Sequence, residues 1–232
     1  MTKTRLAAFF VALASLGAAA TPTTALAAPA ANWVERVTLS PIGGHVMGNP
    51  AARTKLVEYI SYTCSHCAQF VNQASGPLKS GYVKDGAVSV EVRNAVRDKY
   101  DLAASLLARC GGPRRFFANH EALFANQSAW MERVIAYDRD GATKPTDEKA
   151  ALRDIGAKTG LYALMGKRGF TAPQLDACIN DPAAMKAILA MREEAWTKLK
   201  ISGTPAFTLN GKLLDSVSSW DGLKAALPGG AR

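Results

Sequence analysis

Hydrophobic and polar positions early in the chain change from the period of a strand to that of a helix and back. Residues 54–61 (TKLVEYIS) are rich in β-branched and aromatic side chains and follow the turn sequence of residues 48–50, which predicts a strand. Residues 88–92 (VSVEV) alternate apolar and polar side chains and predict a second strand. Between them apolar residues recur at helical spacing, with a break or kink expected at Gly76-Pro77. Strand, helix and strand within about forty residues predict a parallel pair of strands.

The middle of the chain has a different pattern. From about residue 98 to residue 200 the periodicity is almost entirely helical. Asp181-Pro182 predicts a helix start, with an N-cap followed by proline in the first helical position. Behind it we expect one buried stripe, formed by Met185, Ile188, Leu189, Trp196 and Leu199.

Strand signals return near the C-terminus. Residues 205–209 and 212–215 flank Asn210-Gly211, a strong signal for a hairpin turn. A last helix is predicted over residues 219–226 and is stopped by the Pro-Gly-Gly sequence that begins at Pro228. The predicted fold is therefore α/β, with a βαβ unit, an all-helical block of about one hundred residues, and a closing ββα unit.

The N-terminus has the pattern of a secretory signal. Lys3 and Arg5 precede an apolar run over residues 6–20, and small residues ending in Ala25-Leu26-Ala27 follow. We expect a signal peptide over residues 1–27, cleaved after Ala27 or Ala28, with Ala30 as a second choice. An uncleaved membrane anchor is the alternative, which the short run and the following Pro22 disfavour. The predicted location is the periplasm, an oxidising compartment in which disulfides persist.

Charge excludes one class of partner. The chain has 28 Lys and Arg against 19 Asp and Glu, a formal charge of +9, which becomes +7 once the two basic residues of the signal are removed. The basic residues are scattered, and no basic stripe interleaved with aromatic side chains indicates nucleic-acid binding. Attraction to an anionic membrane surface is an alternative to a solvated, solubilising surface.

The candidate chemistry lies in the sequence Cys64-Ser65-His66-Cys67. Cys64 falls where the first strand ends and the helix begins, and the helix dipole and free N–H groups there favour a thiolate. The pKa of a cysteine so placed in a C-x-x-C motif can fall from about 8.5 to roughly 3.5–7.5. His66 can donate to, or pair with, that thiolate. We expect Cys64 to be the exposed nucleophile and Cys67 the more buried partner.

Other interpretations of the pair are weaker. A zinc site needs further ligands, and no second C-x-x-C or H-x-x-H is present. Haem attachment needs a histidine directly after the second cysteine, where the chain has Ala68. A structural bond across three residues closes too small a loop to constrain the unfolded chain much. A redox role is the interpretation that the strand-to-helix position favours.

Two stretches, KLVEYISYTCSHCAQF and ISGTPAFTLNGKLL, resemble the DsbA-like thiol-disulfide oxidoreductases of the thioredoxin superfamily. The similarity runs from about residue 49 to residue 227 and implies a domain over about 40–227, with a helical insertion at about 98–200. It departs from the family at Ser65, where the best-known members have proline, which leaves the reduction potential open.

The resemblance assigns roles to further residues. Cys64 maps to the nucleophile and Cys67 to the resolving cysteine. A buried acid six residues before the nucleophile matches Glu58, where burial should raise the pKa and allow proton exchange with Cys67. The alternative is a carboxylate on the solvent side of an edge strand. A cis-proline matches Pro205, with Thr204 before it pairing with substrate peptide; an ordinary trans loop is the alternative.

The implied function is an exported enzyme that donates its Cys64–Cys67 disulfide to reduced proteins. Its partners would be those substrates and a DsbB-like, quinone-linked membrane protein for reoxidation. No cofactor, metal or nucleic acid is implied, and a monomer is expected. The same fold acting as a reductase or isomerase is one rival, and a peptide-binding chaperone with dispensable cysteines is another.

Two further cysteines, Cys110 and Cys178, lie on apolar helical stripes. In an exported protein leftover cysteines pair more often than not, so we expect a structural disulfide, with two buried free thiols as the alternative. His45 and His120 have no evident partner and are interpreted as structural.

Overall fold

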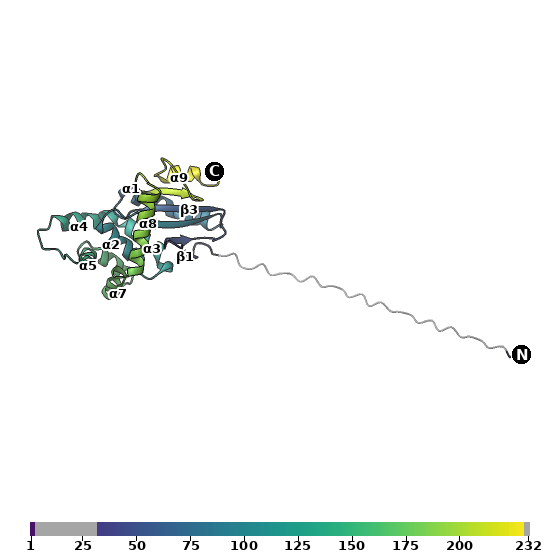
Figure 1. Cartoon of the computed structure of the whole chain (residues 1–232), viewed down its shortest axis with the longest axis horizontal. Helices are drawn as coiled ribbons and strands as arrows, with labels where there is room; N and C mark the ends of the chain where they lie inside the picture. The colour runs from purple at the N-terminus through teal and green to yellow at the C-terminus, as the bar shows by residue number, and fades with distance from the viewer. Residues whose placement is uncertain (3–31, 230–232) are drawn as a thin grey trace. The chain divides into compact units, whose positions relative to one another are not determined.

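A six-stranded mixed sheet is the frame of residues 32–229, which, with residues 1–2, are the part of the chain that the computed structural model describes (Figure 1). The strands lie in the order β1-β2-β4-β3-β5-β6. β3 and β4 are parallel, as predicted, and every other neighbouring pair is antiparallel. The strands are β1 (Val37–Leu39), β2 (His45–Met47), β3 (Thr54–Ile60), β4 (Val88–Asn94), β5 (Ala206–Leu209) and β6 (Lys212–Leu213).

The closing hairpin follows from its two turn residues. Asn210 and Gly211 join β5 to β6 with φ of 49° and 82°, so both lie in the left-handed region that a two-residue hairpin turn requires. The Asn210 side chain also accepts a hydrogen bond from the backbone N–H of Lys55 at 2.8 Å, which ties the turn to β3. The predicted hairpin is confirmed, although β6 is shorter than the expected strand.

The helix after β3 changes character where a break was expected. α1 (Ser65–Pro77) continues without interruption into a π-helical turn, η1 (Leu78–Val83). Pro77 has no N–H to donate, so the regular α-helical ladder is interrupted there, and the chain continues as a short π-helical segment. Phe70 and Val71 are buried against the sheet.

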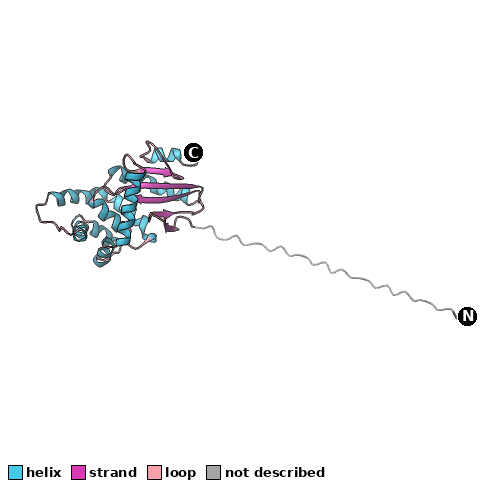
Figure 2. Ribbon diagram, viewed as in Figure 1, coloured by secondary structure: helices cyan, strands magenta, loops and turns pink. Residues whose placement is uncertain are grey.

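The middle of the chain is helical, and the predicted fold class is confirmed. Every regular element that the structure describes between β4 and β5 is a helix, and Figure 2 shows these helices gathered beside one end of the sheet. Asp98 and Asp181 begin two of them as N-caps, each accepting two backbone N–H bonds. The helices are α2 (Lys99–Ala108), α3 (Pro113–Ala125), α4 (Gln127–Arg139), α5 (Glu148–Lys158), α6 (Leu161–Lys167), α7 (Ala172–Ile179), α8 (Pro182–Glu193) and the π-turn η2 (Glu194–Lys198), and α9 (Trp220–Ala226) follows β6.

The predicted buried stripe of α8 and η2 is correct only in part. Ile188 is fully buried, but Leu189 is 46% exposed, and it is one of the large apolar side chains exposed on the described surface. Leu189 is adjacent in sequence to a residue that faces the core, and consecutive helical residues point about 100° apart. The helical period of this segment is as predicted, and Leu189 lies on the solvent face rather than the buried one.

Strands β1 and β2 were not predicted. Each has only three residues, too few for an alternating pattern to be recognised. β2 pairs with β4, so His45 lies in the sheet opposite Val92 and is 2% exposed. Its ring stacks on Phe116 of α3 with 3.6 Å between ring centroids, which fits the structural role expected for His45.

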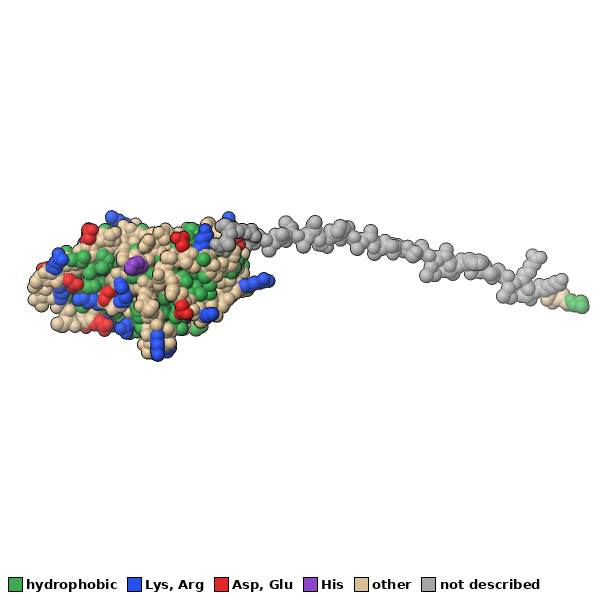
Figure 3. Space-filling view, turned by 90° about the horizontal axis from the view of Figure 1, so that it is seen from above, with side chains coloured by type: hydrophobic (Ala, Val, Ile, Leu, Met, Phe, Trp, Pro, Cys, Tyr) green, Lys and Arg blue, Asp and Glu red, His purple; other side chains and the backbone are tan. Residues whose placement is uncertain are grey.

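One face of the molecule carries charges of both signs. Lys and Arg side chains alternate with Asp and Glu over the face seen in Figure 3. Within the described part of the chain, no helix combines the length and the apolar character needed to cross a membrane. The predicted signal peptide, residues 1–27, lies outside the described residues apart from its first two.

Candidate active site

Cys64 lies at the junction between β3 and α1. It is the N-cap residue of α1, with extended backbone angles, and its carbonyl accepts the Ala68 N–H at 3.2 Å. The N–H groups of the first helical turn have no partners within the helix and present a partial positive charge toward this position. The position that the sequence predicted for the nucleophile is therefore the one the fold provides.

The prediction that Cys64 is exposed is wrong. Cys64 is 5% exposed and Cys67 is 0% exposed, and both are free thiols in this structure. The reason is the loop before β5, which covers the sulfur: the Cys64 thiol donates to the carbonyl oxygen of Thr204 at 3.1 Å.

The surroundings of Cys64 favour its thiolate. Hydrogen bonding from the Cys67 side chain is the largest contribution that lowers the pKa of Cys64 to about 4, while burial opposes it. The Thr204 side chain, the Cys67 backbone and the charge of Arg97 lower it further. The bond from the thiol to the Thr204 carbonyl exists only in the protonated form and acts the other way, so the donors to sulfur prevail.

The cation near Cys64 differs from the one expected. His66 is exposed on the first turn of α1, and within the described residues it makes no hydrogen bond to Cys64. Its neighbour Ser65 is also exposed. Arg97, which follows β4, supplies the positive charge instead. Sequence reasoning missed it because it lies 33 positions after Cys64 and belongs to no local motif.

Cys67 has the opposite electrostatic environment. It lies one turn into α1 and is fully buried, and burial raises its pKa well above the usual value, with the neighbouring Cys64 adding to the effect. The two sulfurs therefore differ strongly in acidity: Cys64 is the stable anion and Cys67 the stable thiol.

Glu58 lies in the sheet interior rather than on an edge. β3 has β4 on one side and β5 on the other, and Glu58 pairs with Val92 and Phe207. It is 4% exposed, and burial raises its pKa to about 8, with the nearby negative charge of Glu121 adding to the shift. Its Oε1 atom has no hydrogen-bond partner among the described residues. Glu58 is thus a neutral acid near pH 7 that holds a proton in the core.

Thr204 and Pro205 form one wall of a cleft beside Cys64. The peptide bond between them is cis, and Pro205 is buried. The cleft has a volume of about 320 Å³ and is lined by His66, the loop of residues 201–206 and the segment of residues 213–218. The Thr204 hydroxyl is buried without a partner among the described residues, which leaves its proton available to a sulfur.

Two polar residues that sequence reasoning missed form hydrogen bonds with the backbone of the catalytic segment, residues 61–64. Asp101 of α2 accepts the Tyr62 N–H at 2.7 Å and the Arg97 N–H at 3.0 Å, and burial raises its pKa to about 7. Gln127, the first residue of α4, donates through its amide nitrogen to the carbonyls of Tyr62 at 2.7 Å and Cys64 at 2.8 Å. Both come from the helical insertion, and no local sequence signal indicates either role.

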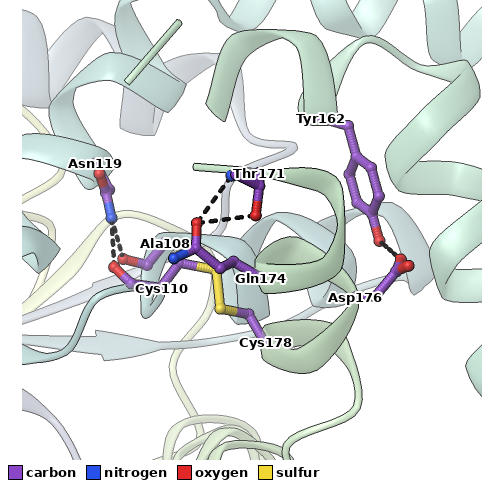
Figure 4. The surroundings of a disulfide bond; sticks show 8 residues. All are labelled: Ala108, Cys110, Asn119, Tyr162, Thr171, Gln174, Asp176 and Cys178. Carbon is purple, nitrogen blue, oxygen red and sulfur yellow. Dashed lines mark hydrogen bonds between the residues drawn. A yellow bond between two sulfur atoms is a disulfide. The ribbon is translucent and has the colours of Figure 1, made fainter. Parts of the chain in front are cut away.

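The other two cysteines form a disulfide. Cys110 lies just after α2, Cys178 lies in the last turn of α7, and their Cα atoms are 5.6 Å apart (Figure 4). The amide of Asn119 donates to the carbonyls of Ala108 and Cys110 at 3.2 and 2.9 Å, next to the bond. This disulfide lies wholly within the helical insertion.

A strand, a C-x-x-C at the start of the following helix and a facing cis-proline loop together define the site of a thiol-disulfide oxidoreductase with the thioredoxin fold. A thioredoxin family model matches residues 40–228. The chain belongs to the thioredoxin family, and the resemblance to its DsbA-like members is confirmed by the relatives that follow.

Two curated relatives are similar along most of this chain. A protein-disulfide oxidoreductase by name from Rickettsia bellii is 27% identical over 174 residues, which are 75% of this chain and 59% of that protein. The thiol:disulfide interchange protein DsbL of Escherichia coli O6:H1 is 27% identical over 175 residues, 71% of this chain and 72% of the relative. The chain thus spans a little over half the length of the rickettsial relatives.

Two solved structures have the same fold. The protein-disulfide isomerase of Novosphingobium aromaticivorans superposes with a TM-score of 0.70 at 34% identity, covering 79% of this chain and 94% of that one. Wolbachia pipientis alpha-DsbA1 superposes with a TM-score of 0.59 at 24% identity, covering 75% and 77%. The second likeness bears on the fold alone.

Proposed function

We propose that this protein is an exported oxidase that donates the Cys64–Cys67 disulfide to reduced substrate proteins. The observation that carries the proposal is the asymmetry of the two sulfurs: Cys64 at a helix start with a pKa of about 4, and Cys67 buried with a raised pKa. A stabilised thiolate lowers the free energy of the reduced enzyme only, because the disulfide has no charge to stabilise.

The first step is attack by a substrate thiolate on the sulfur of Cys64. A bond forms between the substrate sulfur and Cys64, and the Cys64–Cys67 bond breaks with its electron pair on Cys67. The raised pKa of Cys67 makes that leaving thiolate take up a proton. Glu58, protonated near pH 7, is the acid we assign to supply it.

The second step releases the product. A second substrate thiolate attacks the substrate sulfur of the mixed disulfide, the substrate disulfide forms, and Cys64 leaves as a thiolate. A thiol of low pKa is a good leaving group, so the same environment favours both release and oxidation. The substrate loses two electrons, and the enzyme gains them as its dithiol.

Thr204 and Pro205 would present the substrate. The Thr204 carbonyl already accepts a hydrogen bond next to Cys64, and the cleft continues along residues 213–218. We propose that an extended substrate peptide adds along this loop by backbone pairing, which is compatible with many different sequences.

The remaining assignments follow from the sequence. The signal over residues 1–27 supports export to the periplasm, with the domain over about 40–227 and its helical insertion over about 98–200 as the mature enzyme. We assign it as a monomer that needs no cofactor, and reoxidation would come from a DsbB-like membrane quinone oxidoreductase.

The rival with an observation in its favour is an isomerase or reductase of the same fold. The Novosphingobium structure, 34% identical, is named a protein-disulfide isomerase. A chaperone that binds peptides in the cleft is a further rival, and it requires the double variant Cys64→Ser, Cys67→Ser to keep its function.

The test measures the reduction potential of the Cys64–Cys67 pair against glutathione buffers. An oxidase requires a potential well above that of thioredoxin, about −270 mV. A value at or below that level would support the reductase. In parallel, Cys67→Ala should trap substrate proteins on Cys64, whereas Cys64→Ala should trap none. Adducts found only through Cys67 would reverse the two roles.

A further inference from the structure

Arg97 is fixed to the segment that leads into Cys64. Its Nε donates to the hydroxyl of Ser61 at 2.9 Å, and its terminal nitrogen donates to the hydroxyl of Thr63 at 3.0 Å. Its backbone N–H donates to the buried carboxylate of Asp101 at 3.0 Å. Arg97 is therefore held at its backbone by Asp101 and at its guanidinium by two hydroxyls, although the residue is exposed. An unattached surface arginine would sample many rotamers instead.

The attachment places the charge next to the nucleophile. Thr63 directly precedes Cys64, and Ser61 accepts the N–H of Cys64 at 3.1 Å through its carbonyl. The planar guanidinium fork engages two hydroxyls at once, which a lysine ammonium on a flexible stem reproduces poorly. After the hydrogen bonds from Cys67 and Thr204, the positive charge of Arg97 also lowers the pKa of Cys64.

We propose that Arg97 is a positioning residue of the redox site, which holds a fixed positive charge beside the Cys64 sulfur through the hydroxyls of Ser61 and Thr63. The inference rests on the proposed redox role of Cys64. It gives the electrostatic role expected of His66 to a residue outside the C-x-x-C motif. The charge stabilises the Cys64 thiolate and attracts the anionic thiolate of the substrate to the same place.

The negative charge of Asp98 lies close to the positive charge of Arg97. Its carboxylate accepts a hydrogen bond from the Thr63 hydroxyl at 2.7 Å, so opposite charges meet at one side chain. Asp98 also caps α2. Asp101 of α2, His66 on α1, the buried Glu58 of β3 and Tyr62, whose hydroxyl bonds to His120 of α3, are further titratable groups of this region. Because Arg97 and Asp98 contact the same hydroxyl, removing each charge should shift the Cys64 pKa in opposite directions.

The experiment compares three variants of the full mature chain. Arg97→Gln removes the positive charge. Asp98→Asn removes the negative charge and preserves the cap, since asparagine caps helices as well as aspartate. Lys99→Gln is the matched control, because the Lys99 ammonium lies over the ring of Tyr100 and pairs with Asp138 of α4. The Cys64 pKa is read from the ultraviolet absorbance of the thiolate, and the reduction potential from glutathione equilibrium.

We expect Arg97→Gln to raise the Cys64 pKa by on the order of half a unit, because water screens an exposed charge. The reduction potential should fall by about 15 mV, which is the same shift converted. Asp98→Asn should move both quantities the other way, and Lys99→Gln should move neither. Arg97→Lys should restore part of the shift, and high salt should shrink every difference.

Equal Cys64 pKa values in the wild type, Arg97→Gln and Lys99→Gln would overturn the proposal, as would shifts of the same sign in Arg97→Gln and Asp98→Asn. A merely structural Arg97 would destabilise the oxidised and reduced forms equally and leave the pKa in place. The oxidase proposal is judged separately, on the potential of the wild type.

Discussion

The two cysteine pairs of this chain lie at opposite ends of helices. Cys64 caps the N-terminus of α1, where the helix dipole favours a negative sulfur. Cys110 follows the C-terminus of α2 and Cys178 lies in the last turn of α7. At such helix ends the dipole disfavours a negatively charged sulfur. Burial does not make the redox pair the more accessible one, since Cys64 and Cys67 are 5% and 0% exposed, whereas Cys110 is 1% exposed and Cys178 is only partly buried. The helix end acts together with the hydrogen bonds from Cys67 and Thr204 and the charge of Arg97 to stabilise the reduced form of Cys64.

Loop size also favours the Cys110–Cys178 disulfide over the Cys64–Cys67 disulfide. In the chain-entropy account, a bond across the 68 positions between Cys110 and Cys178 stabilises the fold by about 4 kcal/mol. The same account gives the short Cys64–Cys67 loop only about 2 kcal/mol. For each unit by which the Cys64 pKa lies below the working pH, the reduced form is stabilised by about 1.4 kcal/mol. A Cys64 pKa about two units below the working pH is therefore enough to cancel the stability that the short loop gives the oxidised form.

Both pairs nevertheless have the same kind of hydrogen-bonded support beside the first cysteine. A buried amide side chain donates to two backbone carbonyls beside each first cysteine: Gln127 to Tyr62 and Cys64, and Asn119 to Ala108 and Cys110. The amides hold both segments in place, so fixed geometry alone does not make a cysteine pair reactive. The charge environment around the sulfur does.

The sharpest test of the comparison is selective reduction. Across glutathione and dithiothreitol buffers, we expect the Cys64–Cys67 bond to open at a potential at least about 100 mV higher than Cys110–Cys178, since structural disulfides in exported proteins are typically below about −300 mV. Mass-tagged alkylation of each cysteine measures both transitions. The double variant Cys64→Ser, Cys67→Ser isolates the second. Opening of both pairs over one range of potentials would abolish the distinction.

Removal of the Cys110–Cys178 disulfide tests whether this second pair contributes to stability and not to activity. The double variant Cys110→Ala, Cys178→Ala should lose about 4 kcal/mol of unfolding free energy, from the released loop entropy, and retain the rate of disulfide donation. Changing both residues avoids a free thiol that could exchange with Cys64. Urea unfolding and an assay on a reduced model substrate measure the two quantities. A large loss of activity in the folded variant would mean that the insertion disulfide supports the site.

Local signals were enough to predict most of the fold. Asn210-Gly211 formed its turn, Asp181 capped its helix, and the strand of Glu58 ran beside its parallel neighbour. The turn and the cap depend on residues within a few positions of one another, and the parallel pair follows from the order strand, helix, strand. The short strands β1 and β2 lack that local signal, because their pairing with each other and with β4 is what makes them strands.

The site was predictable only as far as its motif. Cys64 and Cys67 stand out in the sequence, but the cover over Cys64 comes from Thr204, 140 positions away. Gln127 lies 63 positions from Cys64 and Arg97 lies 36 from Ser61. An exposed histidine inside the motif was easier to notice than a distant arginine. Contacts between distant segments depend on the tertiary fold, which periodicity does not contain.

The shared amides give a matched pair of variants. Gln127→Leu removes one donor each from the carbonyls of Tyr62 and Cys64, although Cys64 keeps the Ala68 N–H. Asn119→Leu removes one donor each from the carbonyls of Ala108 and Cys110, and each variant should cost about 2 kcal/mol of stability. Only Gln127→Leu should also change the Cys64 pKa and the rate of disulfide donation, because it alone borders the reactive sulfur. Urea midpoints together with thiolate titration distinguish the two effects. An equal effect of both variants on the pKa would contradict the local character of the site.

The smallest expected effect concerns the stability of the two redox forms. Near pH 7 the reduced protein should be the more stable by about 1 kcal/mol, once screening reduces the thiolate gain and the short-loop term is subtracted. The pKa of Cys64 is lowered from its unfolded value of about 8.5 to about 4, so this gain is complete above the unfolded pKa. It declines as pH falls and is lost once pH falls through about 4, where the folded thiolate takes up its proton. Glu58 and Asp101, whose pKa values are raised, lie in both forms and largely cancel in the difference. The advantage of the reduced form should therefore change sign on acidification, because the loop term does not depend on pH. Urea midpoints of both forms across the acid range measure this, and an oxidised form that is the more stable at every pH would favour the reductase over the oxidase.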